Sequence, residues 1–180
     1  MAEYLYDTKI PKERIAVLIG KDGITKKHIE SATKIKIKID SKEGDVFLEG
    51  EDALGLYSAR EVVKAIGRGF NPEIALLLLK QDYMFEMINT LDYVKSKNHM
   101  IRLKGRVIGA EGQSRKTIES LTETYISVYG KTIGIIGFSE NVTIAKKAVE
   151  SLLSGSPHSS VYKWLEKRRS DMKRKDLEIK

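Results

Sequence analysis

The sequence predicts an α+β protein built from two copies of one small unit. The phrase IGKDG at 19–23 returns as IGAEG at 108–112, about ninety residues later. This offset is too long for a solenoid, whose repeats span about 20–50 residues, so it indicates two domains. The segment 34–39 then alternates strictly between Lys and Ile, which is typical of a half-buried strand. Helix-like and strand-like segments therefore surround each copy of the phrase in the same order.

The first copy contains six expected elements around the glycine phrase. The spacing of apolar residues and the positions of glycine and proline predict the order strand, helix, helix, strand, strand and helix, with the glycine loop between the two neighbouring helices. Their expected ranges are 4–10, 12–19, 24–32, 34–39, 46–48 and 52–66.

The second copy repeats this order, with a longer first helix. The triplet Gly130-Lys131-Thr132 lies between two apolar strands and is interpreted as a hairpin turn. It lacks the earlier glycine that a phosphate-binding P-loop requires. The expected ranges are 84–91, 98–107, 114–121, 125–129, 132–137 and 141–153.

Two further segments complete the domain organisation. Asn71-Pro72-Glu73 is a helix start that leads into the wholly apolar run 74–79, so we expect a packed helix between the units. A basic helix should follow Pro157, with Val161, Trp164 and Leu165 facing the core. The expected boundaries are 1–70 and 83–155 for the repeated domains, 71–82 for the helix between them, and 156–180 for the C-terminal basic helix.

Composition narrows the classes of function. The chain has 180 residues, a formal charge of +7 and no cysteine, which favours an anionic partner and excludes thiolate metal sites and cysteine nucleophiles. The three histidines are scattered without metal-ligand spacing, so neither a metal nor another cofactor is expected. No signal peptide and no apolar run of about 20 residues is visible, and we therefore expect a cytoplasmic protein without a membrane partner.

The glycine phrases have the chemistry of a phosphate clamp. Glycine lets the backbone approach a phosphate without a Cβ in the way, and the helix that follows offers unpaired N–H groups and a positive dipole end. With a strand alongside, such a loop frames a groove that is too narrow for a duplex but fits a single strand. The sequence therefore predicts binding of single-stranded RNA.

The element order with its Gly-x-x-Gly loop resembles the type I KH domain, with β-α-α-β-β-α in each copy. The second half is also similar to the archaeal and eukaryotic KH proteins of small-ribosomal-subunit assembly, through 103–112, 126–132, 135–137 and the C-terminal His158, Val161 and Leu165. The resemblance implies binding to ribosomal RNA near the 3′ end of the small-subunit RNA, during pre-rRNA processing. A companion endonuclease, not the KH protein, would cut that RNA, and a translation initiation factor is a further implied partner.

The residues expected to contact RNA are the two loops, nearby cations and four apolar groove residues. They are Ile19, Gly20, Lys21, Asp22, Gly23, Lys26, Lys27 and Ile37 in the first copy, and Lys104, Arg106, Ile108, Gly109, Ala110, Glu111, Gly112, Arg115, Lys116 and Ile126 in the second.

Two alternatives to a purely RNA-binding protein stay open from the sequence. One copy could serve as a scaffold that docks a protein while the other binds RNA. A nuclease would need a carboxylate cluster or a histidine pair beside the groove, whereas Asp22, Glu30, Glu111 and Glu119 are spaced as ordinary surface charges on helices. We therefore expect no catalytic residues. The basic tail is interpreted equally well as a solvated helix face and as a source of sequence-independent RNA affinity.

Overall fold

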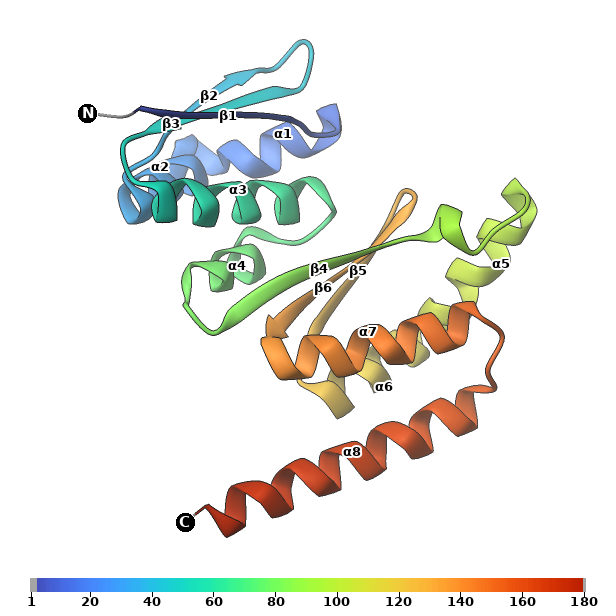
Figure 1. Ribbon diagram of the computed structural model, residues 1–180. Coiled ribbons are helices and arrows are strands. Elements are labelled where there is room, and N and C mark those ends of the chain that lie inside the picture. Colours follow the sequence, from blue (N-terminus) through green and yellow to red (C-terminus); the bar gives the residue numbers. More distant parts are fainter. Residues whose placement is uncertain (1–2, 180) are drawn as a thin grey trace. The chain divides into compact units, whose positions relative to one another are not determined.

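The computed structural model describes residues 3–179 and divides into two compact units, one ending at Phe85 and the other beginning at Glu86. Each unit contains one three-stranded sheet and has the β-α-α-β-β-α order expected for a type I KH domain (Figure 1). The tandem α+β architecture predicted from the repeat is confirmed.

In the first unit the strand order is β1-β3-β2, with antiparallel pairing, and three helices cover one face of the sheet (Figure 1). The elements are β1 (Tyr4–Lys9), α1 (Lys12–Ile19), the 3-10 turn η1 (Lys21–Gly23), α2 (Ile24–Thr33), β2 (Lys36–Asp40), β3 (Asp45–Gly50) and α3 (Ala53–Gly67).

The alternating Lys-Ile segment places its isoleucines in the core. Ile35 and Ile37 are each 1% exposed, while the intervening lysines face solvent. Leu18 of α1 and Ile29 of α2 meet them from the helix layer and are fully buried. Alternation in the strand and 3.6-residue spacing in the helices therefore bring the two layers together.

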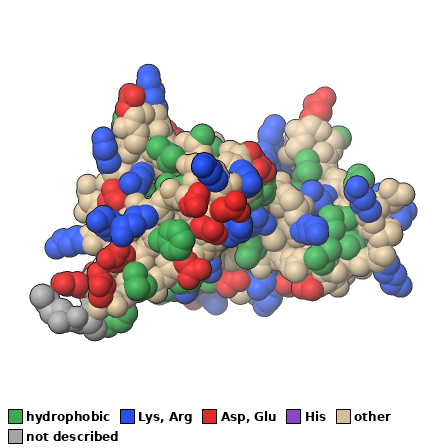
Figure 2. Space-filling view, turned by 90° about the horizontal axis from the view of Figure 1, so that it is seen from above, with side chains coloured by type: hydrophobic (Ala, Val, Ile, Leu, Met, Phe, Trp, Pro, Cys, Tyr) green, Lys and Arg blue, Asp and Glu red, His purple; other side chains and the backbone are tan. Residues whose placement is uncertain are grey.

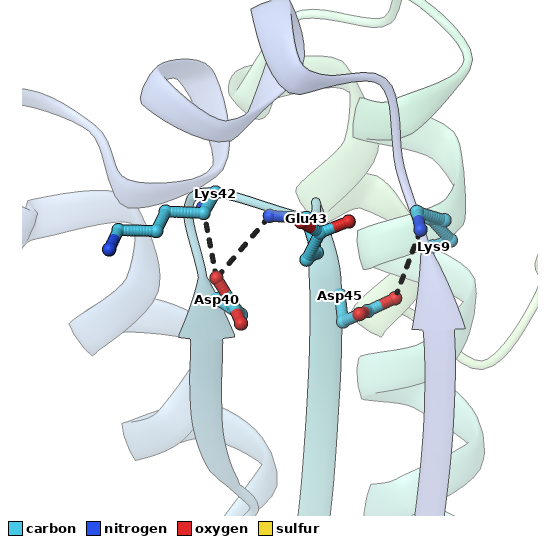
Figure 3. A network of polar contacts seen from close by, with 5 residues as sticks. All are labelled: Lys9, Asp40, Lys42, Glu43 and Asp45. Carbon is cyan, nitrogen blue, oxygen red and sulfur yellow. Dashed lines mark hydrogen bonds and ion pairs between the residues drawn. The ribbon is translucent and has the colours of Figure 1, made fainter.

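Local polar contacts fix the ends of these elements. In the β2–β3 turn, Asp40 Oδ1 accepts hydrogen bonds from the main-chain N–H of Lys42 at 2.9 Å and of Glu43 at 3.3 Å (Figure 3). Lys9 at the end of β1 forms an ion pair with Asp45, the first residue of β3, at 3.8 Å (Figure 3). The turn and the strand register are thus set by side chains as well as by the core.

The apolar segment after Pro72 packs within the first unit. It forms a single turn of α-helix, α4 (Pro72–Ala75), and continues as the 3-10 helix η2 (Leu76–Leu79). Both contact α3, and Ala75 and Leu78 are buried.

The second unit repeats the first, with strand order β4-β6-β5, and adds a long C-terminal helix that packs against α6 and α7. Its elements are β4 (Tyr83–Asn89), the 3-10 turn η3 (Thr90–Asp92), α5 (Lys97–Ile108), the 3-10 turn η4 (Ala110–Gly112), α6 (Gln113–Thr122), β5 (Tyr125–Tyr129), β6 (Thr132–Phe138), α7 (Ser139–Leu153) and α8 (His158–Glu178).

The β5–β6 turn and helix α8 contain residues whose places were predicted from the sequence. Gly130 and Lys131 form the β5–β6 turn, as expected. On α8, Val161 and Leu165 are buried, but Trp164 is only partly buried, so the expected core role of its ring is wrong in part. Within residues 3–179, no helix combines the length and apolar character needed to cross a membrane.

Candidate nucleic-acid interface

The two Gly-x-x-Gly loops have nearly identical backbone geometry. Gly20 lies at φ 75°, ψ 171° and Gly109 at φ 74°, ψ 174°. The acidic residue in each loop is left-handed, with Asp22 at φ 54°, ψ 25° and Glu111 at φ 55°, ψ 28°. In each loop the N–H of the second glycine donates to the carbonyl of the first, at 3.1 and 3.2 Å. The sequence repeat is therefore a repeat of one loop conformation.

The two glycines of a loop serve different purposes. A Cβ on Gly20 would lie 2.8 Å from the main-chain nitrogen of Thr25, and one on Gly109 would lie 2.6 Å from that of Ser114. These first glycines let the loop fold tightly against the helix that follows. A Cβ on Gly23 would instead meet only the end of the Lys27 side chain, at 3.7 Å. The second glycines are required by their positive φ, not by crowding.

Each loop leads into the N-terminus of a ten-residue helix. The caps of α2 and α6 are Gly23 and Gly112, and neither helix start has a side-chain capping bond. The first N–H groups of a helix have no partner within it, and the dipole makes this end positive. The N–H groups of Ile24 and Gln113 already donate to the carbonyls of Lys21 and Ala110, so the positive dipole end and the N–H groups that follow are what each helix start offers to an anion.

A lysine one turn into each helix adds a full positive charge above the loop. Lys27 Nζ lies 3.4 Å from the carbonyl oxygen of Asp22, and Lys116 Nζ lies 3.5 Å from that of Glu111. Both lysine side chains are exposed, so the ammonium groups can exchange these weak contacts for a phosphate. Lys21 and Ala110, in the middle of the loops, are exposed as well.

The apolar residues expected to form the groove floor fall into two classes. Ile19 and Ile108, next to the loops, are partly exposed and available to a ligand. Ile37 and Ile126 are only 1% and 3% exposed, because their side chains point into the core between sheet and helices. At these two positions only the backbone of the strand can face a bound nucleotide.

Two expected RNA-binding cations of the second unit make hydrogen bonds within the unit. Arg106 donates from Nε to the carbonyl of Leu152 at 3.2 Å and from Nη2 to the carbonyl of Ser156, which anchors the end of α7. Lys104 Nζ donates to the carbonyl of Gly130, in the β5–β6 turn, at 2.8 Å. Proximity to the loop in sequence did not reveal these internal partners.

Lys26 and Arg115 hold the same position in α2 and α6 but differ in their polar contacts. Lys26 of α2 forms an ion pair with Glu30 at 3.8 Å. Arg115 holds the same place on α6, and its Nε atom is buried without a hydrogen-bond partner in the part of the chain that the structure describes. A buried, unsatisfied guanidinium nitrogen is costly and marks a place for an acceptor.

Residues behind the loops were not predicted from the sequence. Thr25 and Ser114 each follow the second glycine by two positions and contact the first glycine. Ser114 is 3% exposed, and its Oγ has no hydrogen-bond partner among residues 3–179. The recurrence of a small hydroxyl residue at one place in both copies was the available signal.

The shifted carboxyl pKa values belong to a pair on the first unit. A hydrogen bond between Glu3 and Glu49 raises the pKa of Glu3 and lowers that of Glu49, which also forms an ion pair with Lys38 at 3.1 Å. Among the described residues, no group of three His, Asp or Glu side chains is arranged to hold a metal ion.

Family comparisons agree with this geometry. Residues 6–68 match the model of the KH domain, and residues 84–170 match that of the eukaryotic type KH-domain, type I. The chain is 51% identical over 175 residues to a KH domain-containing protein of Methanocaldococcus jannaschii, covering 95% of this chain and 77% of the relative. It therefore belongs to the family of tandem KH-domain proteins.

Other relatives connect this family with RNA. The RNA-binding protein pno1 of Dictyostelium discoideum is 30% identical over 89% of this chain and 70% of its own length. The pre-rRNA-processing protein pno1 of Aspergillus oryzae is 31% identical over 81% of this chain, which spans 57% of that relative.

Solved structures are similar over nearly the whole chain. A chain in the crystal structure of the a/eIF2alpha-aDim2p-rRNA complex from Pyrococcus horikoshii is 48% identical, with a TM-score of 0.88 over 94% of this chain and 96% of that one. A protein of unknown function from Aeropyrum pernix is 37% identical, with a TM-score of 0.91 over 98% and 96%.

Proposed function

We propose that this protein binds single-stranded ribosomal RNA through both Gly-x-x-Gly loops and acts in pre-rRNA processing, without cutting the RNA itself. The observation that carries the proposal is the duplicated loop, with one backbone conformation and one lysine above it in each unit. Relatives that are RNA-binding or pre-rRNA-processing proteins support it, as does the similar structure that contains rRNA. The RNA near the 3′ end of the small-subunit rRNA is the proposed target, and the cytoplasm the proposed location.

The proposed contact surface follows from the geometry of the loops. The backbone of the loops and the first turns of α2 and α6 would hold phosphates, with Lys27 and Lys116 supplying charge. Lys26 and Arg115 lie one position earlier on the same helices. Arg106 and Lys104 would act indirectly, because their donors already bind carbonyls within the second unit.

The test adds one acid to each loop. Lys21→Asp and Ala110→Asp each give a loop two acidic middle residues, and both positions are exposed, so folding should be preserved. We expect each variant to bind a single-stranded oligonucleotide of the small-subunit rRNA 3′ end at least tenfold more weakly in fluorescence anisotropy, and the double variant more weakly still. The structure favours these variants over Gly20→Asp, whose side chain would collide with Thr25.

The matched control is Lys147→Asp, at an exposed position on α7, which makes the same change in charge as Lys21→Asp. Unchanged binding by both loop variants, with intact circular dichroism, would rule out the clamps. Crosslinking to RNA in cells, with sequencing of the bound fragments, then identifies the target.

A second candidate function is a scaffold in which one unit also docks a protein. The similar structure from Pyrococcus horikoshii is a complex with a/eIF2alpha as well as rRNA, which favours a translation initiation factor as partner; an assembly endonuclease is the other candidate. Capture of the partner from an RNase-treated lysate, retained by the double loop variant, would separate protein docking from RNA binding.

A further inference from the structure

In each unit a glutamate from the second helix binds the edge strand of the sheet. Glu30 Oε1 accepts a hydrogen bond from the main-chain N–H of Ile37 at 2.8 Å, and Glu119 Oε1 accepts one from that of Ile126 at 2.8 Å. Both acceptors are seven residues before their donors. β2 and β5 are edge strands, so these N–H groups point away from the rest of the sheet.

The contact is not needed to bring the strand to the core. The side chains of Ile37 and Ile126 are already buried in the helix–sheet interface. An outward N–H at a sheet edge can usually be satisfied by water. A carboxylate in that place instead fixes the distance between the helix that follows the loop and the strand beside it.

In the first unit the glutamate also connects the strand to a cation near the loop. Glu30 pairs with Lys26 one turn earlier on α2, at 3.8 Å. On α6 the same position, one turn before Glu119, is held by Arg115, whose Nε lacks a partner among residues 3–179. In both units the order is therefore loop, cation, glutamate and edge strand.

We infer that Glu30 and Glu119 are positioning residues that set the width of the RNA groove and decide which main-chain groups of β2 and β5 face the ligand. This inference rests on the proposed function. Each glutamate accepts the hydrogen bond of one outward-facing N–H of its strand. The ligand therefore meets the neighbouring outward-facing main-chain N–H and carbonyl groups, at a fixed distance from the phosphate clamp. The negative charge of the carboxylate repels RNA and so lowers affinity. Its hydrogen bond to the strand shapes the groove and so raises affinity, and the two effects are opposite in sign.

Two conservative substitutions separate these effects. Glu119→Gln keeps the length and an acceptor oxygen but removes the charge. Glu119→Asp keeps the charge but is one methylene too short to reach Ile126. We expect Glu119→Gln to bind the rRNA 3′-end oligonucleotide as well as the wild type or up to threefold more tightly, and Glu119→Asp to bind five- to tenfold more weakly. Glu30→Gln and Glu30→Asp should differ in the same sense.

Selectivity provides a second measurement, for which oligouridylate of equal length is the competing probe. Glu119→Asp should lose several-fold preference for the rRNA oligonucleotide over oligouridylate, while Glu119→Gln keeps it. Amide exchange monitored by NMR should be slow at Ile126 in Glu119→Gln and fast in Glu119→Asp. Glu140→Asp, at an exposed position on α7, is the matched control.

Equal affinity and selectivity of Glu119→Asp and wild type would overturn the inference, as would tighter binding by both variants. The proposed clamp fails separately: if Ala110→Asp leaves binding unchanged, the clamp of the second unit is wrong. If Ala110→Asp weakens binding but Glu119→Asp does not, only the positioning role is wrong.

Discussion

At the scale of single residues, the two units match at two positions where a non-glycine residue lies in the left-handed region of φ, which makes four such residues in the described part of the chain. Asp22 and Glu111 lie inside the loops, and Lys34 and Glu123 are the residues that end α2 and α6. A left-handed conformation costs an L-residue about 1–2 kcal/mol, and helices commonly end in glycine for this reason. The two units thus have the same backbone conformation even at positions where neither has glycine, the residue that adopts it most easily.

This strain gives the first prediction at the residue scale. Replacing Lys34 or Glu123 with Gly should raise the free energy of unfolding by about 1 kcal/mol, because glycine adopts the helix-ending conformation without a Cβ penalty. Chemical denaturation monitored by circular dichroism measures the change. Lys34→Ala and Glu123→Ala keep the Cβ at φ 59° and φ 53° and should not show the gain. An equal gain from alanine would mean that charge, not backbone strain, is responsible.

At the scale of secondary-structure elements, each unit ties its first helix to the end of its last KH helix with one arginine. Arg14 of α1 donates to the carbonyls of Ile66, at 2.8 Å, and Phe70, at 2.7 Å. Arg106 of α5 donates to those of Leu152 and Ser156, and its own carbonyl accepts from His158 Nε2 at 2.8 Å. These bonds satisfy carbonyls at a helix end that would otherwise lack partners.

The arginine contact of the second unit can be tested against its expected RNA role. Arg106→Ala should lower the free energy of unfolding by about 3 kcal/mol, since it removes two hydrogen bonds from a charged donor, each worth about 1.5–3 kcal/mol. Arg102→Ala, at an exposed position on the same helix, is the control and should stay within about 0.5 kcal/mol. Thermal and denaturant unfolding provide the measurement. If Arg106→Ala weakened RNA binding strongly while leaving stability unchanged, the sequence-based RNA contact would be restored.

The element order was predictable from sequence, while the partners of single side chains were not. Strict alternation at 34–39 and the apolar spacing of 12–19 depend on local periodicity, which a sequence displays directly. Arg14 and Arg106 both bind carbonyls at the end of the last KH helix of their unit. They stand at different positions of the repeat, six and three residues before the first loop glycine. Nothing in the repeat reveals that shift, because contacts across 46 to 56 residues depend on packing. The same limit left Ile37 and Ile126 among the expected RNA contacts.

At the scale of the whole molecule, net charge and the local geometry of the loops contribute differently to the affinity for RNA. The chain carries a formal charge of +7, yet basic and acidic side chains are interspersed on the face shown in Figure 2. A mixed surface gives little long-range attraction, so affinity should depend on the few cations beside the two clamps. Two clamps in one chain can also raise affinity through effective concentration, provided that one RNA strand reaches both.

The salt dependence of RNA binding tests this division of roles. For single strands, the logarithm of the binding constant falls with the logarithm of salt concentration by about 0.7 for each phosphate neutralised. Lys27→Gln and Lys116→Gln should each make this slope shallower by about 0.7, and the double variant by about 1.4, in anisotropy titrations over a range of KCl concentrations. Lys9→Gln, whose lysine pairs with Asp45, should leave the slope unchanged. A lysine variant with weaker binding but the wild-type slope would show that the lysine shapes the loop without contacting phosphate. If Lys9→Gln changed the slope as much as the clamp variants, the attraction would come from the overall charge of the protein, and Lys27 and Lys116 would have no specific role in binding phosphate.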